Sequence, residues 1–598
     1  MTHLSEDCRR LIVQETAVHE LDVLRRAVAA SPDVTLLRLP AHDRNTTLSD
    51  ISELAAILRS SLPQSATLII VGEVLDLVHI HTEVVSSLQY HLWIAIKRHT
   101  LRIDAQATAL PEHHFGALVY THLGSPLAHT KTRIEYTYCP TCNKTTKDYG
   151  GKKHTYHEYG TLVSDVWRDI ACDPEGDITP IVERFADLFG IERYHHLHVL
   201  DLQTFESQPN QVSFHEFDTS INSFPPAKEN TVILGDCLQE LRQLPDNSID
   251  FAFADPPYNL GKDYTGYSDD LAIAEYFDWC DEWISKLARV LKPGRTCALL
   301  NIPLWAIRHF LHMETVLQFQ NWIAWDALSF PVRLIMPAHY TILCFTKGTP
   351  RPLPGLTGQS GMTEPPFVPR TFRSLSPLAE GYCLRQKCVQ NRLRLQVNDR
   401  GPLTDLWWDI HRVKHNSRRV DHPCQLPPQL MYRLISLFTM PGETVLDCFN
   451  GAGTSTLAAH QIGRSYLGIE ATPKYRDLAH RRHIEITRGI DPFRKQESVL
   501  TEKNSPVARL PKQKYAISKK TLQLEVKRIA QALGHIPDRA EVIAHGKYPI
   551  RYYDTYFSSW GEVCAAARTT GMSESREVGA EETRGERAYQ PHLFILEE

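Results

Sequence analysis

Four consecutive residues, Asp255-Pro256-Pro257-Tyr258, form the first motif whose residue types could carry chemistry. They directly follow the apolar run FAFA, so they lie at the carboxyl end of an expected strand, where open α/β sheets bind ligands. Proline has no backbone N–H, so the two prolines fix the chain and leave carbonyls that only accept. Asp255 and the Pro256 carbonyl could accept both protons of an exocyclic amine, while the Tyr258 ring stacks on a planar base. A proline-rich turn without chemistry is the alternative interpretation.

A glycine-rich loop is the second such motif. Residues 447–454, DCFNGAGT, follow the apolar run ETVL and precede an expected helix, STLAAHQIG. Glycines between a strand and a helix let the backbone approach a nucleotide closely. Glu470 ends the next expected strand, where a carboxylate can accept both ribose hydroxyls. The spacing G-x-G-x-x-G is absent, because Thr454-Ser455-Thr456 follows Gly453, and this favours an adenosine ligand without a pyrophosphate over a dinucleotide.

Short apolar runs alternate with helical segments around these motifs. Leu271 to Leu291 and Pro428 to Phe438 have helical spacing. The alternation predicts an α/β fold with a mostly parallel sheet. The runs are TVILGD (231–236), DFAFAD (250–255), CALLNI (297–302), YTILCF (340–345), ETVLDC (443–448) and SYLGIE (465–470).

The composition is that of a globular protein. The chain has 598 residues, of which 42% are hydrophobic and 23% are charged, and this excludes a disordered or fibrous bulk. The length corresponds to about three or four domains. No apolar run approaches the ~18 residues of a membrane helix, and MTHLSEDCRR does not resemble a signal peptide, so we expect a cytoplasmic protein without a membrane partner. Since the net charge is −5, nucleic-acid binding would require local basic patches.

Residues 231–486 resemble the β group of DNA amino-methyltransferases, which use S-adenosylmethionine. The similar segments are VILGDCLQELRQLPDNSIDFAFADPPYNLGKDY, DLWWDI, HPCQLPPQL and PGETVLDCFNGAGTSTLAAHQIGRSYLGIEATPKY. The catalytic motif precedes the cofactor motif, which is the order of the β group. The resemblance implies a Rossmann-like sheet that binds S-adenosyl-L-methionine and transfers a methyl group to the exocyclic amine of a base in double-stranded DNA.

The resemblance also implies roles for individual residues. Asp255, Pro256, Pro257 and Tyr258 would hold a flipped base. Leu426 stands where the family usually has Lys, and His339-Tyr340 stands where it often has His-Glu, which leaves the finer cofactor contacts open. The implied cofactor residues are Asp236 near the adenine, Asp447 as the loop-orienting group, Phe449, Gly451, Gly453 and Thr454 in the pocket, Glu470 on the ribose and His422 at the closing helix.

The chemistry needs positioning more than proton abstraction. The base must leave the duplex to enter the site. Because the sulfonium is an activated donor, the rate of methyl transfer depends mainly on aligning the lone pair of the amine. In the family that this segment resembles, an Asp before the two prolines more often accompanies methylation at N6 of adenine, so the resemblance favours adenine, with N4 of cytosine as the alternative. A DNA-binding regulator on an inactive fold and an RNA or protein methyltransferase are further alternatives. The sequence shows no nuclease motif, so a restriction endonuclease partner would be a separate chain.

The N-terminal third resembles the catalytic half. LWIAIKR (92–98) parallels NWIAWDA (321–327), and GTLVSDVWRDI (160–170) parallels GPLTDLWWDI (401–410), in the same order. The N-terminal copy lacks both the Asp-Pro-Pro-Tyr motif and the glycine-rich loop. We expect a degenerate methyltransferase-like domain that makes the protein a monomer with an internal pseudo-dimer. A homodimer and an unrelated α/β domain are the alternatives.

Four soft side chains could bind a structural zinc ion. Cys139 and Cys142 form a CxxC pair that His154 and His157 follow. The two histidines are closer in sequence than in usual zinc sites. Ordinary core thiols are therefore the alternative.

Basic segments are candidates for DNA contact. The segment 382–396, YCLRQKCVQNRLRLQ, lies in an expected target-recognition insert at about 348–405. Lys514 to Met572 resembles the homing-endonuclease-associated repeat through Leu533-Gly534, Tyr552-Tyr553 and FSSW (557–560), which implies a small all-α DNA-binding module. The candidate contacts are Arg385, Lys387, Arg392, Arg394, Lys519 and Lys520.

The sequence therefore predicts five parts. They are a lead-in (1–60), a degenerate methyltransferase-like domain (60–225), a catalytic domain (226–495), a helical repeat (514–572) and a tail (573–598).

Overall fold

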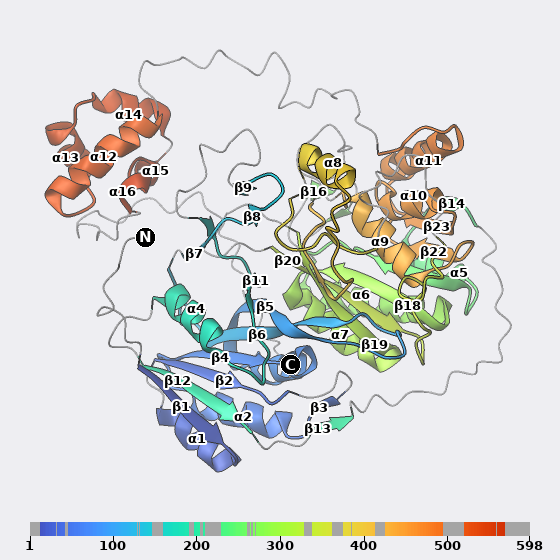
Figure 1. Ribbon diagram of the computed structural model, residues 1–598, viewed down its shortest axis with the longest axis horizontal. Helices are drawn as coiled ribbons and strands as arrows, with labels where there is room; N and C mark the ends of the chain where they lie inside the picture. The colour runs from blue at the N-terminus through green and yellow to red at the C-terminus, as the bar shows by residue number, and fades with distance from the viewer. Residues whose placement is uncertain are drawn as a thin grey trace. The chain divides into compact units, whose positions relative to one another are not determined.

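The computed structural model describes residues 12–568 with gaps, the longest of which are 146–159, 210–228, 328–337, 362–374, 413–424 and 494–518. The chain forms two units, one ending at Gln496 and the other beginning at Glu497, and Figure 1 shows their helices and strands. None of the described helices is long and apolar enough to cross a bilayer.

The later half of the larger unit contains an eight-stranded sheet in the order β14-β23-β22-β15-β18-β20-β19-β21. β20 is antiparallel to both of its neighbours, and the other pairs are parallel. This arrangement confirms the predicted α/β fold with a mostly parallel sheet. The strands are β14 (Thr231–Leu234), β15 (Ile249–Ala254), β18 (Leu291–Asn301), β19 (Gln318–Asp326), β20 (His339–Thr346), β21 (Leu406–Trp407), β22 (Thr444–Asp447) and β23 (Ser465–Glu470).

Helices cover both faces of this sheet, because alternate side chains of a buried strand point to opposite sides. Ala252 and Ala254 of β15 belong to a core with α5, α6 and α7, whereas Phe251 and Phe253 belong to a core with α9 and α10. Since β15 and β22 are parallel neighbours, their carboxyl ends lie at the same edge. The helices are α5 (Cys237–Gln243), α6 (Ile273–Val290), α7 (Pro303–Val316), α9 (Pro428–Phe438), α10 (Thr454–Gln461) and α11 (Pro473–Thr487).

The earlier half of the unit contains a seven-stranded sheet in the order β1-β12-β2-β4-β6-β5-β11. β6 is antiparallel to both neighbours, and the other pairs are parallel. The strands of this sheet are β1 (Ile12–Val18), β2 (Val34–Arg38), β4 (Thr67–Gly72), β5 (Leu88–Arg102), β6 (Glu112–His122), β11 (Val166–Ala171) and β12 (His196–Leu202). The helices of this half are α1 (Leu21–Ala30), α2 (Ile51–Ser61), α3 (Val74–Val84) and α4 (Thr179–Phe189).

The two sheets share the order and direction of most of their strands. The run β12-β2-β4-β6-β5-β11 corresponds to β22-β15-β18-β20-β19-β21. The antiparallel ladders even break register at equivalent places, between Tyr90 and Leu92 and between Phe319 and Asn321. The two sheets therefore share one topology over these six strands. The copies differ next to β12, where β1 takes the place that β23 has beside β22.

One predicted boundary is wrong. β1 and β2 both pair with β12 in the N-terminal sheet, so residues 12–60 are part of the N-terminal half and not a separate lead-in. The similar sequence segments lie on the later strands, and that is why sequence comparison placed the start near residue 60.

Equivalent residues of the two halves contact each other, as expected at a two-fold axis. The Trp93 and Trp322 rings stack with centroids 4.7 Å apart and planes 11° apart. Nearby, Ala95 and Val166 share a small apolar cluster with Ala324 and Leu406. The two halves therefore pack against each other through equivalent residues.

The described part of the smaller unit is all-α, as the sequence predicts. Its core includes Leu522, Val526, Tyr553 and Phe557, so Phe557 is a packing residue. Asp538 and Glu541 form a capping box at the start of α13. The helices are α12 (Lys519–Leu533), α13 (Arg539–His545), α14 (Ile550–Tyr556), α15 (Trp560–Val563) and α16 (Ala565–Arg568).

Candidate active site

The Asp-Pro-Pro-Tyr segment leaves β15 at its carboxyl end and is held by hydrogen bonds. The Tyr258 hydroxyl donates to Asp255 Oδ1 at 2.9 Å. The Tyr276 hydroxyl donates to the Pro257 carbonyl at 2.8 Å, and Trp305 Nε1 donates to the Tyr258 carbonyl at 2.9 Å. These bonds fix the last two carbonyls of the motif and orient the Asp255 carboxylate.

Aromatic side chains extend from this motif. The Tyr258 ring, 8% exposed, lies 6.5 Å from the Tyr340 ring, and the Arg412 guanidinium lies 4.9 Å from the Tyr340 centroid. A planar base can stack on such a surface, and guanidinium groups add cation–π attraction. Tyr340 stands where the family often has Glu, so this chain has an aromatic ring in place of a carboxylate.

The glycine-rich loop turns sharply between β22 and α10. Gly451 and Gly453 have φ of 50° and 85°, a region that favours glycine. A Cβ on Gly453 would lie 2.9 Å from the Ala479 Cβ, so this glycine also allows α11 to approach the loop. Asp447 accepts hydrogen bonds from the Phe449 backbone N–H and the Ser455 hydroxyl. The predicted role of Asp447 in orienting the loop agrees with these two bonds.

Glu470 closes the loop from the end of β23. Its Oε2 accepts from the Gly451 N–H at 2.7 Å, and its Oε1 accepts from the Thr472 N–H at 2.8 Å. Each carboxylate oxygen has a second lone pair, so this carboxylate can also accept from hydroxyl groups. The geometry fits the predicted ribose-binding role.

The site concentrates negative charge in a buried setting. Burial, with smaller contributions from the Asp255 and Glu470 carboxylates, raises the pKa of Asp447 to about 7. Burial also raises the pKa of Glu470 above its usual range. Such carboxyls are ionised more readily when a cation lies beside them. The site therefore suits a positively charged ligand such as a sulfonium.

Phe449 lies among the rings of α6. Its ring centroid is 5.6 Å from that of Trp279 and 5.1 Å from that of Trp283, both edge-on. Phe449 is only partly buried against this cluster, so part of its ring can face a ligand. Thr454 is buried at the first position of α10.

Two further predicted cofactor residues, Asp236 and His422, are not shown to be part of this buried site. Asp236 is exposed and caps α5 by accepting from the Gln239 N–H at 3.1 Å. His422 lies outside the described residues. The residues that can be placed, with their paired carboxylates and close glycines, fit an adenosine cofactor with a positive charge.

The structure adds residues that the sequence analysis missed. Tyr276 and Trp305 hold the catalytic motif, and no sequence pattern marks them as site residues. Asn450 lies inside the loop motif, where its residue type alone indicates no role; its Nδ2 is buried and has no hydrogen-bond partner among the described residues.

One predicted DNA contact is wrong. The Arg392 side chain is 1% exposed and bonds to Asp399 Oδ2, the Cys388 sulfur and the Cys383 carbonyl, so it is a structural group. Its position in a basic run could not reveal this burial. Lys387 and Arg394 are exposed on α8 (Gln386–Arg394), and Arg385, at its N-cap, is half-buried.

The remaining predicted DNA contacts and metal ligands also differ from one another in their surroundings. Lys520 is exposed, while Lys519 pairs with Glu562 at 3.3 Å. Cys139 and Cys142 lie beside Cys383 and Cys388. His154 and His157 lie outside the described residues.

The sheet is mostly parallel, the glycine-rich loop follows β22, and the Asp-Pro-Pro-Tyr motif follows the neighbouring β15. This combination defines an S-adenosylmethionine-dependent methyltransferase fold. Residues 249–481 match the model of a DNA methylase family of the N6/N4 type. Residues 517–567 match the homing endonuclease associated repeat, which confirms the predicted C-terminal module.

Individual relatives align with the same region. The type II methyltransferase M.BamHI of Bacillus amyloliquefaciens is 33% identical over 270 residues, covering 44% of this chain and 59% of the relative. The DNA adenine methyltransferase YhdJ of Escherichia coli is 28% identical over 260 residues, covering 42% and 82%. A solved cytosine-N4-specific PvuII DNA methyltransferase is 18% identical, covering 45% and 95%, with a TM-score of 0.30.

Proposed function

We propose that this protein transfers a methyl group from S-adenosyl-L-methionine to the exocyclic amine of a base in double-stranded DNA. The observation that supports this most directly is the Asp255–Tyr258 pair at the carboxyl end of β15, beside the loop that follows β22. The base holder and the cofactor loop thus leave neighbouring parallel strands. The aligned methyltransferases named above make DNA the proposed substrate.

Asp255 and the Pro256 carbonyl accept the two amine protons of a base extruded from the duplex. This fixes the direction of the nitrogen lone pair, while Tyr258 and Tyr340 hold the ring plane. When bound, S-adenosylmethionine supplies a methyl group activated by its positive sulfur. The new N–C bond forms as the S–C bond breaks, and the amine then loses a proton. No strong base is needed, because positioning supplies most of the rate.

Glu470 and the loop residues hold the cofactor. The Glu470 carboxylate is placed to accept ribose hydroxyls, and Gly451 and Gly453 let the ligand approach the backbone. Asp447 maintains the loop through Phe449 and Ser455. His422 and Asp236 remain proposed contributors near the helix that closes the site and near the adenine.

We propose adenine N6 as the target, with cytosine N4 as the alternative. The test is to incubate DNA with enzyme and cofactor, digest it and analyse the nucleosides by mass spectrometry. We expect N6-methyladenine with the wild type and none with Asp255→Ala. N4-methylcytosine would overturn the choice of base, and unmodified DNA would overturn the activity.

We further propose that the protein acts as a monomer whose N-terminal half replaces a partner subunit. The paired Trp93 and Trp322, at equivalent positions in the two halves, support this proposal. Light scattering after gel filtration should give one chain of 68.2 kDa. A mass of two chains would favour the homodimer. Any cognate restriction endonuclease would then be a separate protein.

A further inference from the structure

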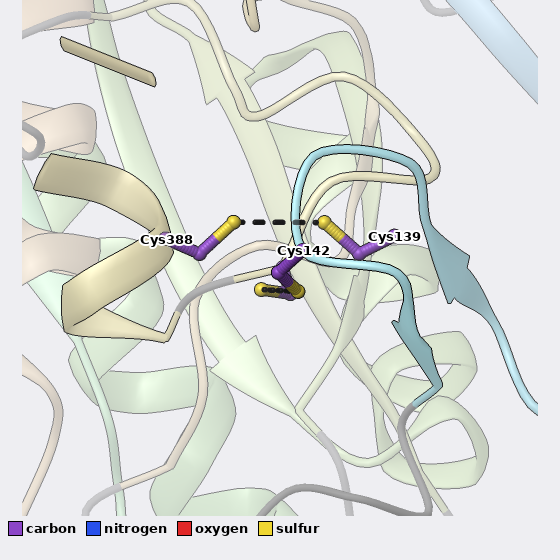
Figure 2. Close-up of side chains that lie close together, drawn as sticks. Cys139, Cys142 and Cys388 are labelled. Carbon is purple, nitrogen blue, oxygen red and sulfur yellow. Dashed lines mark hydrogen bonds between the residues drawn. The ribbon is translucent and has the colours of Figure 1, made fainter. Parts of the chain in front are cut away.

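Four cysteine sulfurs converge where the N-terminal half meets the recognition insert. Cys139 ends β8 (Tyr138–Cys139), and Cys142 lies on the turn between β8 and β9 (Lys144–Thr145). Cys383 precedes α8, and Cys388 lies within its first turns. All four sulfurs lie within 4.8 Å of one another. Figure 2 shows the sulfurs of Cys139 and Cys388 pointing toward each other, from the hairpin and from α8.

The distances between the sulfurs fit a metal site and not disulfides. Cys139 Sγ lies 3.7 Å from Cys388 Sγ, and Cys142 Sγ lies 3.8 Å from Cys383 Sγ. A disulfide bond is about 2.05 Å long. A tetrahedral site with Zn–S bonds of about 2.3 Å places neighbouring sulfurs roughly 3.8 Å apart. We propose that Cys139, Cys142, Cys383 and Cys388 together bind one structural zinc ion.

Positive groups surround these sulfurs, as a site of four thiolates requires. Zinc with four thiolates has a net charge of about −2. Arg392 Nη1 lies 3.1 Å from the Cys388 sulfur, and Arg385 Nη1 lies 4.0 Å from the Cys142 sulfur. Such outer groups orient the ligands and balance their charge. The buried Arg392, which is not a DNA contact, thereby gains a role.

The ligand set differs from the one that the sequence predicts. The CxxC pair is retained, but its partners are cysteines separated from it by more than two hundred residues, Cys139 and Cys388 being 249 apart. Within the described parts of the chain, this is the one group of His, Cys, Asp or Glu placed to hold a metal. Four sulfur ligands in a tetrahedron favour zinc or iron over magnesium or calcium.

The two cysteine pairs follow the internal repeat. Tyr138-Cys139 in the first copy parallels Tyr382-Cys383 in the second, so each half contributes two ligands. A metal here cross-links the β8–β9 hairpin to α8 and fixes the insert on the N-terminal half. The ion therefore positions the recognition insert.

The first test is metal analysis of the full-length protein purified without chelator. We expect one zinc per chain, and loss of zinc in Cys383→Ser/Cys388→Ser. The matched control is Cys172→Ser/Cys564→Ser, which changes two buried cysteines outside the cluster and should retain zinc. Absence of zinc from the wild type, or iron in its place, would overturn the proposal.

A second test begins with the wild type, because a cysteine variant that fails to fold would also lose zinc. Alkylation of the denatured, unreduced wild type should modify all 13 cysteines, as measured by intact mass. A disulfide that peptide mapping of the alkylated protein locates at Cys139 or Cys142 would overturn the site. His154→Ala/His157→Ala should still hold one zinc ion, and loss of zinc from that variant would overturn the four-cysteine set.

Discussion

Asp165 and Asp405 occupy equivalent positions in the two halves, and each binds the backbone of the other half. Asp165 Oδ1 accepts from the Ala338 and His339 N–H groups at 2.8 and 2.9 Å. Asp405 Oδ1 accepts from the His113 N–H at 2.7 Å. Both carboxylates are buried, so these reciprocal bonds join the halves at their pseudo-two-fold axis.

Removing Asp165 should destabilise this junction. Asp165→Ala leaves two buried N–H groups without an acceptor, and each unsatisfied group costs about 1–3 kcal/mol. We expect a loss of about 2–5 kcal/mol in the free energy of unfolding, measured by urea denaturation. Asp165→Asn keeps an acceptor oxygen and should lose less. Equal stability of the alanine variant and the wild type would contradict the role of these bonds.

Much of the catalytic half could be predicted from its sequence, because its motifs lie directly after strands. The runs FAFA and ETVL gave the strands, and chain direction placed Asp255 and the glycine loop at one edge of the sheet. What could not be predicted are contacts across long sequence separations. Trp305 reaches Tyr258, and Cys383 reaches Cys142, through tertiary packing that no local pattern records.

The sequence-based prediction of DNA contacts failed where the burial of a side chain determines its role. Arg392 and Arg394 look alike in a basic helix, yet one is 1% exposed and the other faces solvent. Helical spacing separates two such residues by about 200° around the axis. Which of them faces inward depends on Asp399 and on the cysteines beside it.

Two substitutions in the catalytic motif should have different effects. Asp255→Ala removes an amine acceptor and should lower kcat at least about 100-fold, because catalysis here depends on positioning. Tyr258→Phe keeps the ring and loses the hydroxyl bond to Asp255, so kcat should fall about tenfold. Single-turnover methyl transfer measures both, and calorimetry should show unchanged cofactor Kd. Full activity of Asp255→Ala would contradict the proposed role.

Gly442→Ala is a matched control for Gly453→Ala in the glycine-rich loop. Both have positive φ, 85° and 81°, but only Gly453 has a close neighbour, the Ala479 Cβ at 2.9 Å from an added Cβ. Gly442→Ala should cost about 1–2 kcal/mol for its backbone conformation alone. Gly453→Ala should cost a further ~1–3 kcal/mol from crowding and should weaken cofactor binding. Equal losses in chemical denaturation would contradict the close approach of α11.

Cofactor binding should depend on pH through Asp447. Burial raises the pKa of this carboxyl to about 7, so it is mainly protonated below that pH. A cationic ligand favours the ionised form, and binding should tighten up to about tenfold per unit as pH rises toward 7. Calorimetry at several pH values measures this trend. Asp447→Asn should bind more weakly and with little pH dependence.

The same carboxyl has the opposite effect on the stability of the free protein. In the unfolded chain Asp447 ionises near pH 4, whereas in the folded chain it holds its proton until about pH 7. The folded state therefore binds more protons between these values, and the contribution of Asp447 to stability falls as pH rises through them. Chemical denaturation without cofactor should show that Asp447→Asn removes this decline. A decline that persists in the variant would assign it to another group.

Arg394 and Arg392 should separate DNA binding from stability. Arg394 is exposed on α8, so Arg394→Ala should weaken DNA binding across sequences and reduce the magnitude of the salt slope by about one. Arg392→Ala removes the group that joins Asp399 to the cysteine cluster and should lower the free energy of unfolding by about 3–5 kcal/mol. Fluorescence anisotropy at several salt concentrations and urea denaturation measure the two effects. A loss of stability with Arg394→Ala, or its absence with Arg392→Ala, would contradict the assignment of one arginine to the surface and the other to the interior.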